Sequence, residues 1–153
     1  MVIKMVPMRA FLNKRLTILG LGLALMVFNV PKAHAIGPAS FVTMHDTIPN
    51  FAVNDTIRSV QNGSWSSPST WSPARVPLPT DIVGISHTVT YDSMTGDVDA
   101  IGIASGGVLR FSAAQSTRLN VANLQVQPQG TLEIGTAANP IPANLTAEII
   151  IKN

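Results

Sequence analysis

The stretch IASGGVLRF, residues 103–111, is matched 23 positions later by VQPQGTLEI, residues 126–134. Apolar residues and a glycine fall on equivalent positions: Ile103 on Val126, Gly107 on Gly130, Leu109 on Leu132 and Phe111 on Ile134. A further step of the same length carries Val126 to Ile149. Such a repeat predicts stacked coils, in which each coil adds one strand to a parallel sheet and like residues form ladders inside. An ordinary β-sandwich with a chance match is the alternative.

From Asp55 onward the chain has the texture of an all-β protein. Runs of Val, Ile, Leu and Thr alternate with Gly, Pro, Asn and Ser, and no helical stripe lasts two turns. Residues 81–92 carry apolar side chains at even offsets, which predicts one strand with a buried face. At the matched glycines, Gly107 and Gly130, we expect tight corners that need a positive φ. The expected fold is a short parallel β-helix of stacked β-coils.

The first 35 residues have the features of a secretory signal peptide. Four basic residues precede an apolar run over residues 16–30, and Ala33 and Ala35 supply the small side chains of a cleavage site. An uncleaved membrane anchor is less favoured, because this run is shorter than the ~20 residues that span a bilayer. We therefore expect cleavage after Ala35, a secreted or cell-surface location and no membrane span afterwards. Residues 36–54 are predicted to be an irregular lead-in, and residues 55–153 the β domain.

Removal of the signal changes the charge of the protein. The whole chain has net charge +2, but residues 1–35 hold five of its ten basic residues and none of its eight acidic ones, so the remainder is −3. A chain of this charge lacks the basic surface of a nucleic-acid-binding protein, and we exclude that class. The chain has no cysteine, so neither disulfides nor thiolate metal sites are expected.

The two tryptophans of the chain lie in GSWSSPSTW, residues 63–71. In an extended segment Trp65 and Trp71 project to the same side, because they are six residues apart. They are candidates for a platform on which a sugar ring stacks. The alternative is a lid that closes the open end of the first coil, with Pro68 fixing the turn between them. We favour the lid, because large aromatic side chains bury much area and this chain has few of them.

Three acidic residues near residue 95 form a weak candidate metal site. Asp92, Asp97 and Asp99 offer oxygen ligands for Ca²⁺, although their spacing does not match the twelve-residue calcium loop. A solvated turn is the favoured interpretation, and no other cofactor is expected. Asp81 stands at the entry to a strand, where a carboxylate can accept hydrogen bonds from loop amides, so its predicted role is structural.

Other polar residues are interpreted as surface groups. Arg110 and Glu133 occupy the same outward position one repeat apart, which predicts an ion pair between neighbouring strands. His87 alternates with inward residues and is predicted to be exposed. No hydrolase or phosphate-binding motif is present, and no catalytic residue is predicted.

These features together resemble an extracellular domain named for its eight conserved glycines, the G-eight domain. The resemblance runs from about Val60 to the end of the chain. Its motifs are W-x5-W, the Pro-x3-Asp of Pro77 and Asp81, and G-T-L-E-I-G-x4-P, which starts at Gly130 and includes Gly135. The stretch contains eight glycines, at positions 63, 84, 96, 102, 106, 107, 130 and 135.

The resemblance implies an all-β module of the kind found in fibrocystin-like receptors and cell-surface hyaluronidases, where it opens a longer right-handed parallel β-helix. It carries over no catalytic residue. We therefore expect a non-catalytic module that caps or starts a β-helix and contributes to binding of a carbohydrate, such as a glycosaminoglycan-like polysaccharide, or of a cell-surface partner. Two alternatives stay open: the N-terminal part of a polysaccharide-degrading enzyme, truncated here, and a piece of a structural adhesin.

Overall fold

The computed structural model of the protein describes residues 38–42 and 45–152. The predicted signal peptide and its cleavage residues, Ala33 and Ala35, lie outside them. In the described part the chain is all-β apart from one short 3-10 helix, η1, and no helix there is long and apolar enough to cross a membrane. The elements are β1 Ser40–Val42, β2 Thr47–Pro49, β3 Ile57–Ser59, β4 Gly63–Ser64, η1 Pro68–Thr70, β5 Trp71–Ser72, β6 Ile82–Ile85, β7 Thr88–Tyr91, β8 Gly96–Ile103, β9 Val108–Phe111, β10 Thr117–Val126, β11 Thr131–Glu133 and β12 Ala147–Ile151.

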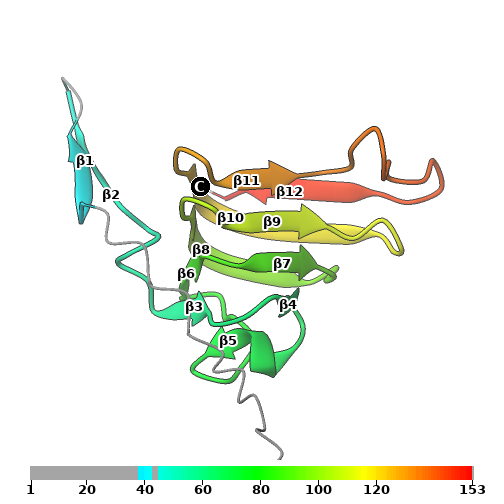
Figure 1. Ribbon diagram of the computed structural model, residues 1–153, viewed down its shortest axis with the longest axis horizontal. Helices are drawn as coiled ribbons and strands as arrows, with labels where there is room; N and C mark the ends of the chain where they lie inside the picture. The colour runs from blue at the N-terminus through cyan, green and yellow to red at the C-terminus, as the bar shows by residue number, and fades with distance from the viewer. Residues whose placement is uncertain (1–37, 43–44, 153) are drawn as a thin grey trace, which may run out of the picture.

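Two sheets form the body of the molecule (Figure 1). One has the strand order β12-β10-β8-β6-β3-β5 and the other the order β11-β9-β7-β4. From β6 onward the chain passes from one sheet to the other at every strand. Neighbouring strands are parallel throughout, except for the antiparallel pair β3–β5 at one end. Figure 1 shows β5 and η1 at the opposite end of the molecule from β11 and β12.

The repeat of 23 residues is confirmed in both sheets. Leu109 of β9 is the partner of Leu132 of β11, and Ile103 of β8 is the partner of Val126 of β10. The further step from Val126 to Ile149 is wrong, because Ile149 is paired with Leu119, 30 residues earlier. The loop between β11 and β12 is long and lengthens this step beyond the others.

The prediction of a single strand over residues 81–92 is also wrong. The segment contains β6 in the larger sheet and β7 in the smaller one, with Ser86 and His87 at the corner between them. The corner takes up two residues, an even number, so buried and outward residues keep alternating in step from β6 to β7. The pattern therefore looks like that of one continuous strand. Ile85, Val89 and Tyr91 are all buried, as expected.

The core lies between the two sheets and consists of ladders of like residues. Val83, Ile101 and Leu124 follow one another across neighbouring strands of the larger sheet. In the smaller sheet the ladder of Val89, Leu109 and Leu132 does the same. Inward residues are fully buried in the middle strands and partly buried at the β11 and β12 end, where Leu132 and Ile149 lie at the margin of the cluster. Ile134, which was expected to point inward, is 43% exposed there.

The segment predicted as an irregular lead-in contains an antiparallel hairpin of β1 and β2. In Figure 1 this hairpin stands beside the two sheets. Asn50, which is fully buried, joins it to the body: its amide Nδ2 donates to the carbonyl oxygen of Pro38 at 2.7 Å, and its Oδ1 accepts from Gln127 of the segment after β10. Gln125 of β10 adds a bond to the carbonyl oxygen of Pro49 at 3.2 Å.

The matched glycines occupy corners, but not for the reason expected from the sequence. The positive φ values fall one residue earlier, at Gly106 (75°) and at Gln129 (66°). At Gly107 the requirement is space, because a Cβ atom there would run into the carbonyl oxygen of Ile85. Gly130 likewise packs closely against the carbonyl oxygens of Ile103 and Ala104.

Candidate functional site

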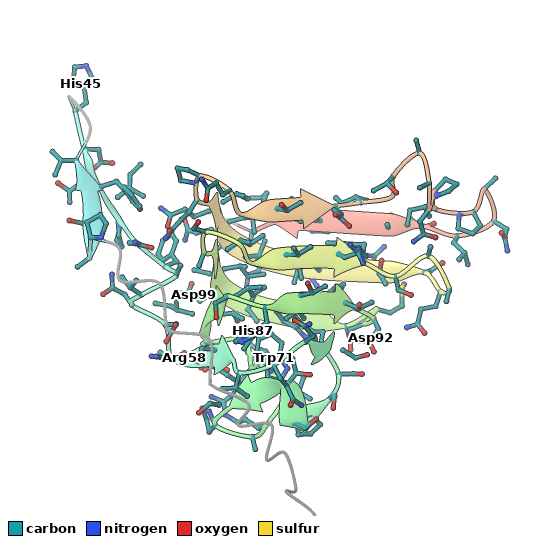
Figure 2. The ribbon with its side chains drawn as sticks, viewed as in Figure 1. His45, Arg58, Trp71, His87, Asp92 and Asp99 are labelled. Carbon is teal, nitrogen blue, oxygen red and sulfur yellow. The ribbon has the colours of Figure 1, made fainter. Side chains whose placement is uncertain are left out.

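Both tryptophans lie inside the protein, at the end of the core beside β5. Trp65 is 1% exposed and Trp71 2% exposed. Their rings meet edge to face with centroids 5.1 Å apart, and Trp71 Nε1 donates to the carbonyl oxygen of Trp65 at 2.8 Å. The label of Trp71 in Figure 2 lies within the body of the molecule. Neither ring presents a face on which a sugar could stack.

The tryptophans begin a column of aromatic rings through the core, which we call the aromatic column: Trp71, Trp65, Tyr91 and Phe111. Ring centroids are 5.0 Å apart from Trp65 to Tyr91 and 4.9 Å from Tyr91 to Phe111. The Tyr91 hydroxyl donates to the carbonyl oxygen of Arg118 at 2.6 Å, and burial raises the pKa of this phenol to about 12. The four rings thus pack against one another inside the core between the two sheets.

Asp81 holds the loop that follows the tryptophans. The carboxylate is 4% exposed and accepts two bonds from the Arg75 guanidinium, at 2.5 and 2.9 Å. It also accepts from the amide of Leu78 at 2.7 Å and from the Thr56 hydroxyl at 2.9 Å. These hydrogen bonds lower the pKa of Asp81 to about 2, and the bonds from Arg75 contribute most, followed by those from Leu78 and Thr56. Pro77, which is buried, lies within this loop.

The three acids proposed as calcium ligands do not gather at one site. Asp92 accepts from the amide of Ser66 at 3.0 Å and from its hydroxyl at 2.7 Å. Asp97 is paired with Lys152, whereas Asp99 is exposed on β8. Figure 2 labels Asp92 and Asp99 at opposite sides of the view. Nowhere in residues 38–42 and 45–152 do three or more acidic or histidine side chains gather in a way that would hold a metal ion.

A ladder of polar residues runs along the outer face of the smaller sheet. Ser64, Thr90, Arg110 and Glu133 are successive register partners on β4, β7, β9 and β11. Each follows an inward residue, so the alternation of the strands turns it outward. Arg110 Nε donates to Glu133 Oε2, which confirms the ion pair expected from the 23-residue offset. This pairing lowers the pKa of Glu133 and raises that of Arg110.

Two adjoining hollows lie over this ladder, with volumes of about 290 and 410 Å³. We call them together the polar groove. Both are lined by Arg110, Phe111 and Asn139. The first adds Glu133, Gly135 and Thr136, and the second adds Thr90 and residues 112–114. Since the Phe111 ring is buried, the accessible groups are a guanidinium, a carboxylate, an amide and hydroxyls, which offer both hydrogen-bond donors and acceptors.

One polar cluster was missed in the sequence. His87, predicted to be exposed, is half-buried, and its Nδ1 lies 3.0 Å from Ser59 Oγ and 3.3 Å from Ser86 Oγ. The Ser86 amide donates to Ser59 Oγ at 3.0 Å. Although serine beside histidine can be nucleophilic, Ser59 is only 2% exposed and satisfies a backbone amide. The cluster therefore holds the corner between β6 and β7 against β3.

The family is decided by a match over the part of the chain that contains the sheets. A sequence model described as the G8 domain matches residues 70–153, more than half of the chain. The chain belongs to the G8 domain family. The resemblance to the G-eight domain is thereby confirmed. No curated protein and no solved structure matches the chain.

Membership of the G8 domain family is in keeping with an extracellular β module. The G8 match includes Arg110, Glu133 and Asn139, so the polar groove lies within the family domain. The G8 match begins at Thr70, so Trp71 lies inside the matched part and Trp65 just before it.

Proposed function

We propose that this G8 domain protein is a secreted, non-catalytic module that forms the capped first coils of a parallel β-helix and binds a carbohydrate chain in the polar groove. The alternation of parallel strands between two sheets supports the β-helix. The observation that carries the binding site is the polar groove, built on the Arg110–Glu133 pair and bordered by Asn139.

The capping role rests on the difference between the two ends of the sheets. At one end the aromatic column and the loop held by Asp81 cover the core, and both tryptophans are buried. At the other end Ile134 and Ile151 are 43% and 60% exposed. A stack of coils needs cover at its ends, because uncovered apolar residues and free strand edges favour aggregation. Trp65 and Trp71 supply such cover at the N-terminal end.

Carbohydrate suits the chemistry of the polar groove. Sugar hydroxyls donate and accept hydrogen bonds, and the groove presents both kinds of group along a row of parallel strands. The Arg110–Glu133 pair carries no net charge. Since residues 36–153 have an overall charge of −3, a neutral, hydroxyl-rich glycan fits better than a densely anionic one.

Hydrolysis by this chain is less favoured than binding. A glycosidase of the usual kind needs two carboxyl groups facing each other across the sugar. The two glutamates of the described residues are each held by an arginine of the neighbouring strand, Glu133 by Arg110 and Glu148 by Arg118. The pair that lines the groove thus provides one carboxylate only, and it is engaged in an ion pair.

The test is titration of the purified chain with soluble glycans, neutral glucans and hyaluronan included, followed by calorimetry. We expect Arg110→Ala and Asn139→Ala each to weaken binding of the best glycan about tenfold or more, since each removes direct hydrogen bonds. Arg118→Ala is the matched control: it breaks a similar ion pair, to Glu148, on the other sheet. Equal effects of Arg110→Ala and Arg118→Ala, or no binding of any glycan by the folded wild type, would contradict the proposal.

A further inference from the structure

The polar groove crosses the strands of the smaller sheet instead of following one of them. One of its two hollows is lined by residues of β9 and β11, and the other by residues of β7 and β9. Figure 1 shows these three strands one above another. Both hollows include Arg110 and Asn139, so they adjoin at the middle strand. A ligand that fills both hollows therefore lies across three neighbouring strands.

Each of these strands adds one outward polar side chain to the floor of the groove. The three residues, Thr90, Arg110 and Glu133, are register partners. Neighbouring strands of a sheet lie ~4.8 Å apart, so polar groups recur along the groove at that interval. The interval is close to the length that one sugar adds to an extended chain of pyranoses joined through equatorial bonds. A chain with axial bonds curves and departs from such a straight row.

The ion pair in the floor leaves groups available to a ligand. Arg110 donates to Glu133 through Nε, and in the part of the chain that the structure describes its side chain forms no other hydrogen bond. A guanidinium has five N–H groups, so those of the two terminal nitrogens stay available. Glu133 accepts through Oε2, which leaves Oε1 as an acceptor. The pair also limits the motion of both side chains, so less order is lost when a ligand binds.

Asn139 forms the wall over both hollows, and a tight turn holds it there. The Asn139 amide donates to the carbonyl oxygen of Thr136 at 3.1 Å, and the Thr136 amide donates to the carbonyl oxygen of Asn139 at 3.0 Å. The Asn139 amide also lies 3.0 Å from Thr136 Oγ1, which accepts from it. The side chain of Asn139 forms no hydrogen bond within residues 38–42 and 45–152. Its amide group is thus free to donate to a sugar and to accept from it.

From this spacing we infer that the ligand of the polar groove is a straight, neutral glycan with equatorial links, which lies across the strands with one sugar on each of β7, β9 and β11. The inference rests on the proposed function and names the class of carbohydrate. Thr90 contacts the first sugar, Arg110 and Asn139 the middle one, and Glu133 the third. The smallest ligand that uses the whole groove is a trisaccharide.

Calorimetric titration with oligosaccharides of defined length tests this inference. Cello- and chito-oligosaccharides have equatorial links, whereas malto-oligosaccharides have an axial bond in every link and form curved chains. We expect affinity in the better of the two equatorial series to rise at least tenfold from the disaccharide to the trisaccharide and to change little beyond four sugars. The malto-trisaccharide should bind at least tenfold more weakly than its equatorial counterpart.

The outcomes separate this inference from the proposed function. Equal affinity for the two kinds of link, or no gain from two sugars to three, would overturn the inference and leave carbohydrate binding standing. Absence of binding by any glycan would contradict both.

Thr90→Val tests the sugar assigned to β7, because it removes the hydroxyl and keeps the shape of the side chain. We expect it to abolish the gain in affinity from the disaccharide to the trisaccharide. Thr88→Val is the matched control, since Thr88 lies on the same face of the same strand but lines neither hollow. Circular dichroism checks that both variants are folded. Equal losses in the two variants, or an unchanged gain in Thr90→Val, would overturn the inference.

Discussion

Trp65 illustrates how a residue that looks like a ligand-binding group serves as core. Its ring contacts both Trp71 and Tyr91, and its exposed fraction is 1%. We predict that Trp65→Ala lowers the free energy of unfolding by about 3–5 kcal/mol, the usual cost of removing a buried large aromatic. Urea unfolding measures this change. Leu78→Ala, at an exposed site, is the control and should change stability little. A Trp65→Ala variant as stable as the wild type would show that the Trp65 ring contributes nothing to the core.

Asp81 makes stability depend on pH. Its pKa is about 2 in the folded protein, against an ordinary value of 3.8, because Arg75 and its other partners favour the carboxylate. The folded state therefore gains stability from Asp81 above about pH 4 and loses it as the pH falls from about 4 to 2. The amount is about 2 kcal/mol.

The variant Asp81→Asn should remove this part of the acid sensitivity. We expect it to be less stable than the wild type at pH 7, and the difference in unfolding free energy to shrink toward pH 2, where the wild-type carboxylate becomes protonated. Urea titrations at several pH values measure both. A constant difference from pH 7 to pH 2 would show that ionisation of Asp81 contributes nothing.

At the scale of elements, the corner between β10 and β11 contains backbone strain that a single substitution can relieve. Gln129 holds a φ of 66°, a value that costs a residue with a side chain ~1 kcal/mol or more, whereas its equivalent one repeat earlier is Gly106. We predict that Gln129→Gly raises the free energy of unfolding by several tenths to about 1 kcal/mol, although it loses the bond from Ser105 Oγ. Thermal denaturation measures the effect. Gln127→Gly is the opposite control, since it loses a bond to Asn50 and relieves no such strain.

The strands that were predicted well are those in which residues 23 positions apart are both apolar and both point into the core. Ladders such as Leu109 and Leu132 follow from one offset, and so does the Arg110–Glu133 pair. Prediction failed where loop length changed the offset, as between β11 and β12. It also failed where a two-residue corner preserved the alternation, as at Ser86 and His87.

The polar groove was beyond prediction from the sequence for a different reason. Thr90, Arg110 and Glu133 can be assigned to one ladder only once the number of residues between paired strands is known. This number differs: Thr90 and Arg110 are 20 residues apart, and Arg110 and Glu133 are 23 apart. Asn139 comes from a loop that carries no repeat. Its position above Arg110 depends on how that loop folds, which neither periodicity nor composition encodes.

At the scale of the whole molecule, the hairpin of β1 and β2 is attached to the sheets largely through Asn50 and two glutamines. We predict that Asn50→Ala detaches the hairpin without unfolding the sheets. The substitution removes the buried hydrogen bonds of the Asn50 side chain, which join the hairpin to the sheets, but it leaves the bonds between the strands of the sheets intact. Hydrogen exchange followed by mass spectrometry should then show faster exchange in β1 and β2 and unchanged exchange in β8 and β10. Faster exchange throughout would mean that the hairpin and the sheets unfold as one unit.

The aromatic column also determines how the protein responds to light. The chain has two tryptophans and one tyrosine, and all three belong to the aromatic column, whose two tryptophans lie at the end of the core beside β5. Excitation of Tyr91 passes to Trp65, which its ring touches, so emission from the whole chain comes from the indoles at this end. Fluorescence therefore reports on the end of the core beside β5. Fraying at β11 and β12 would leave the spectrum unchanged, and an optical melting curve would miss it.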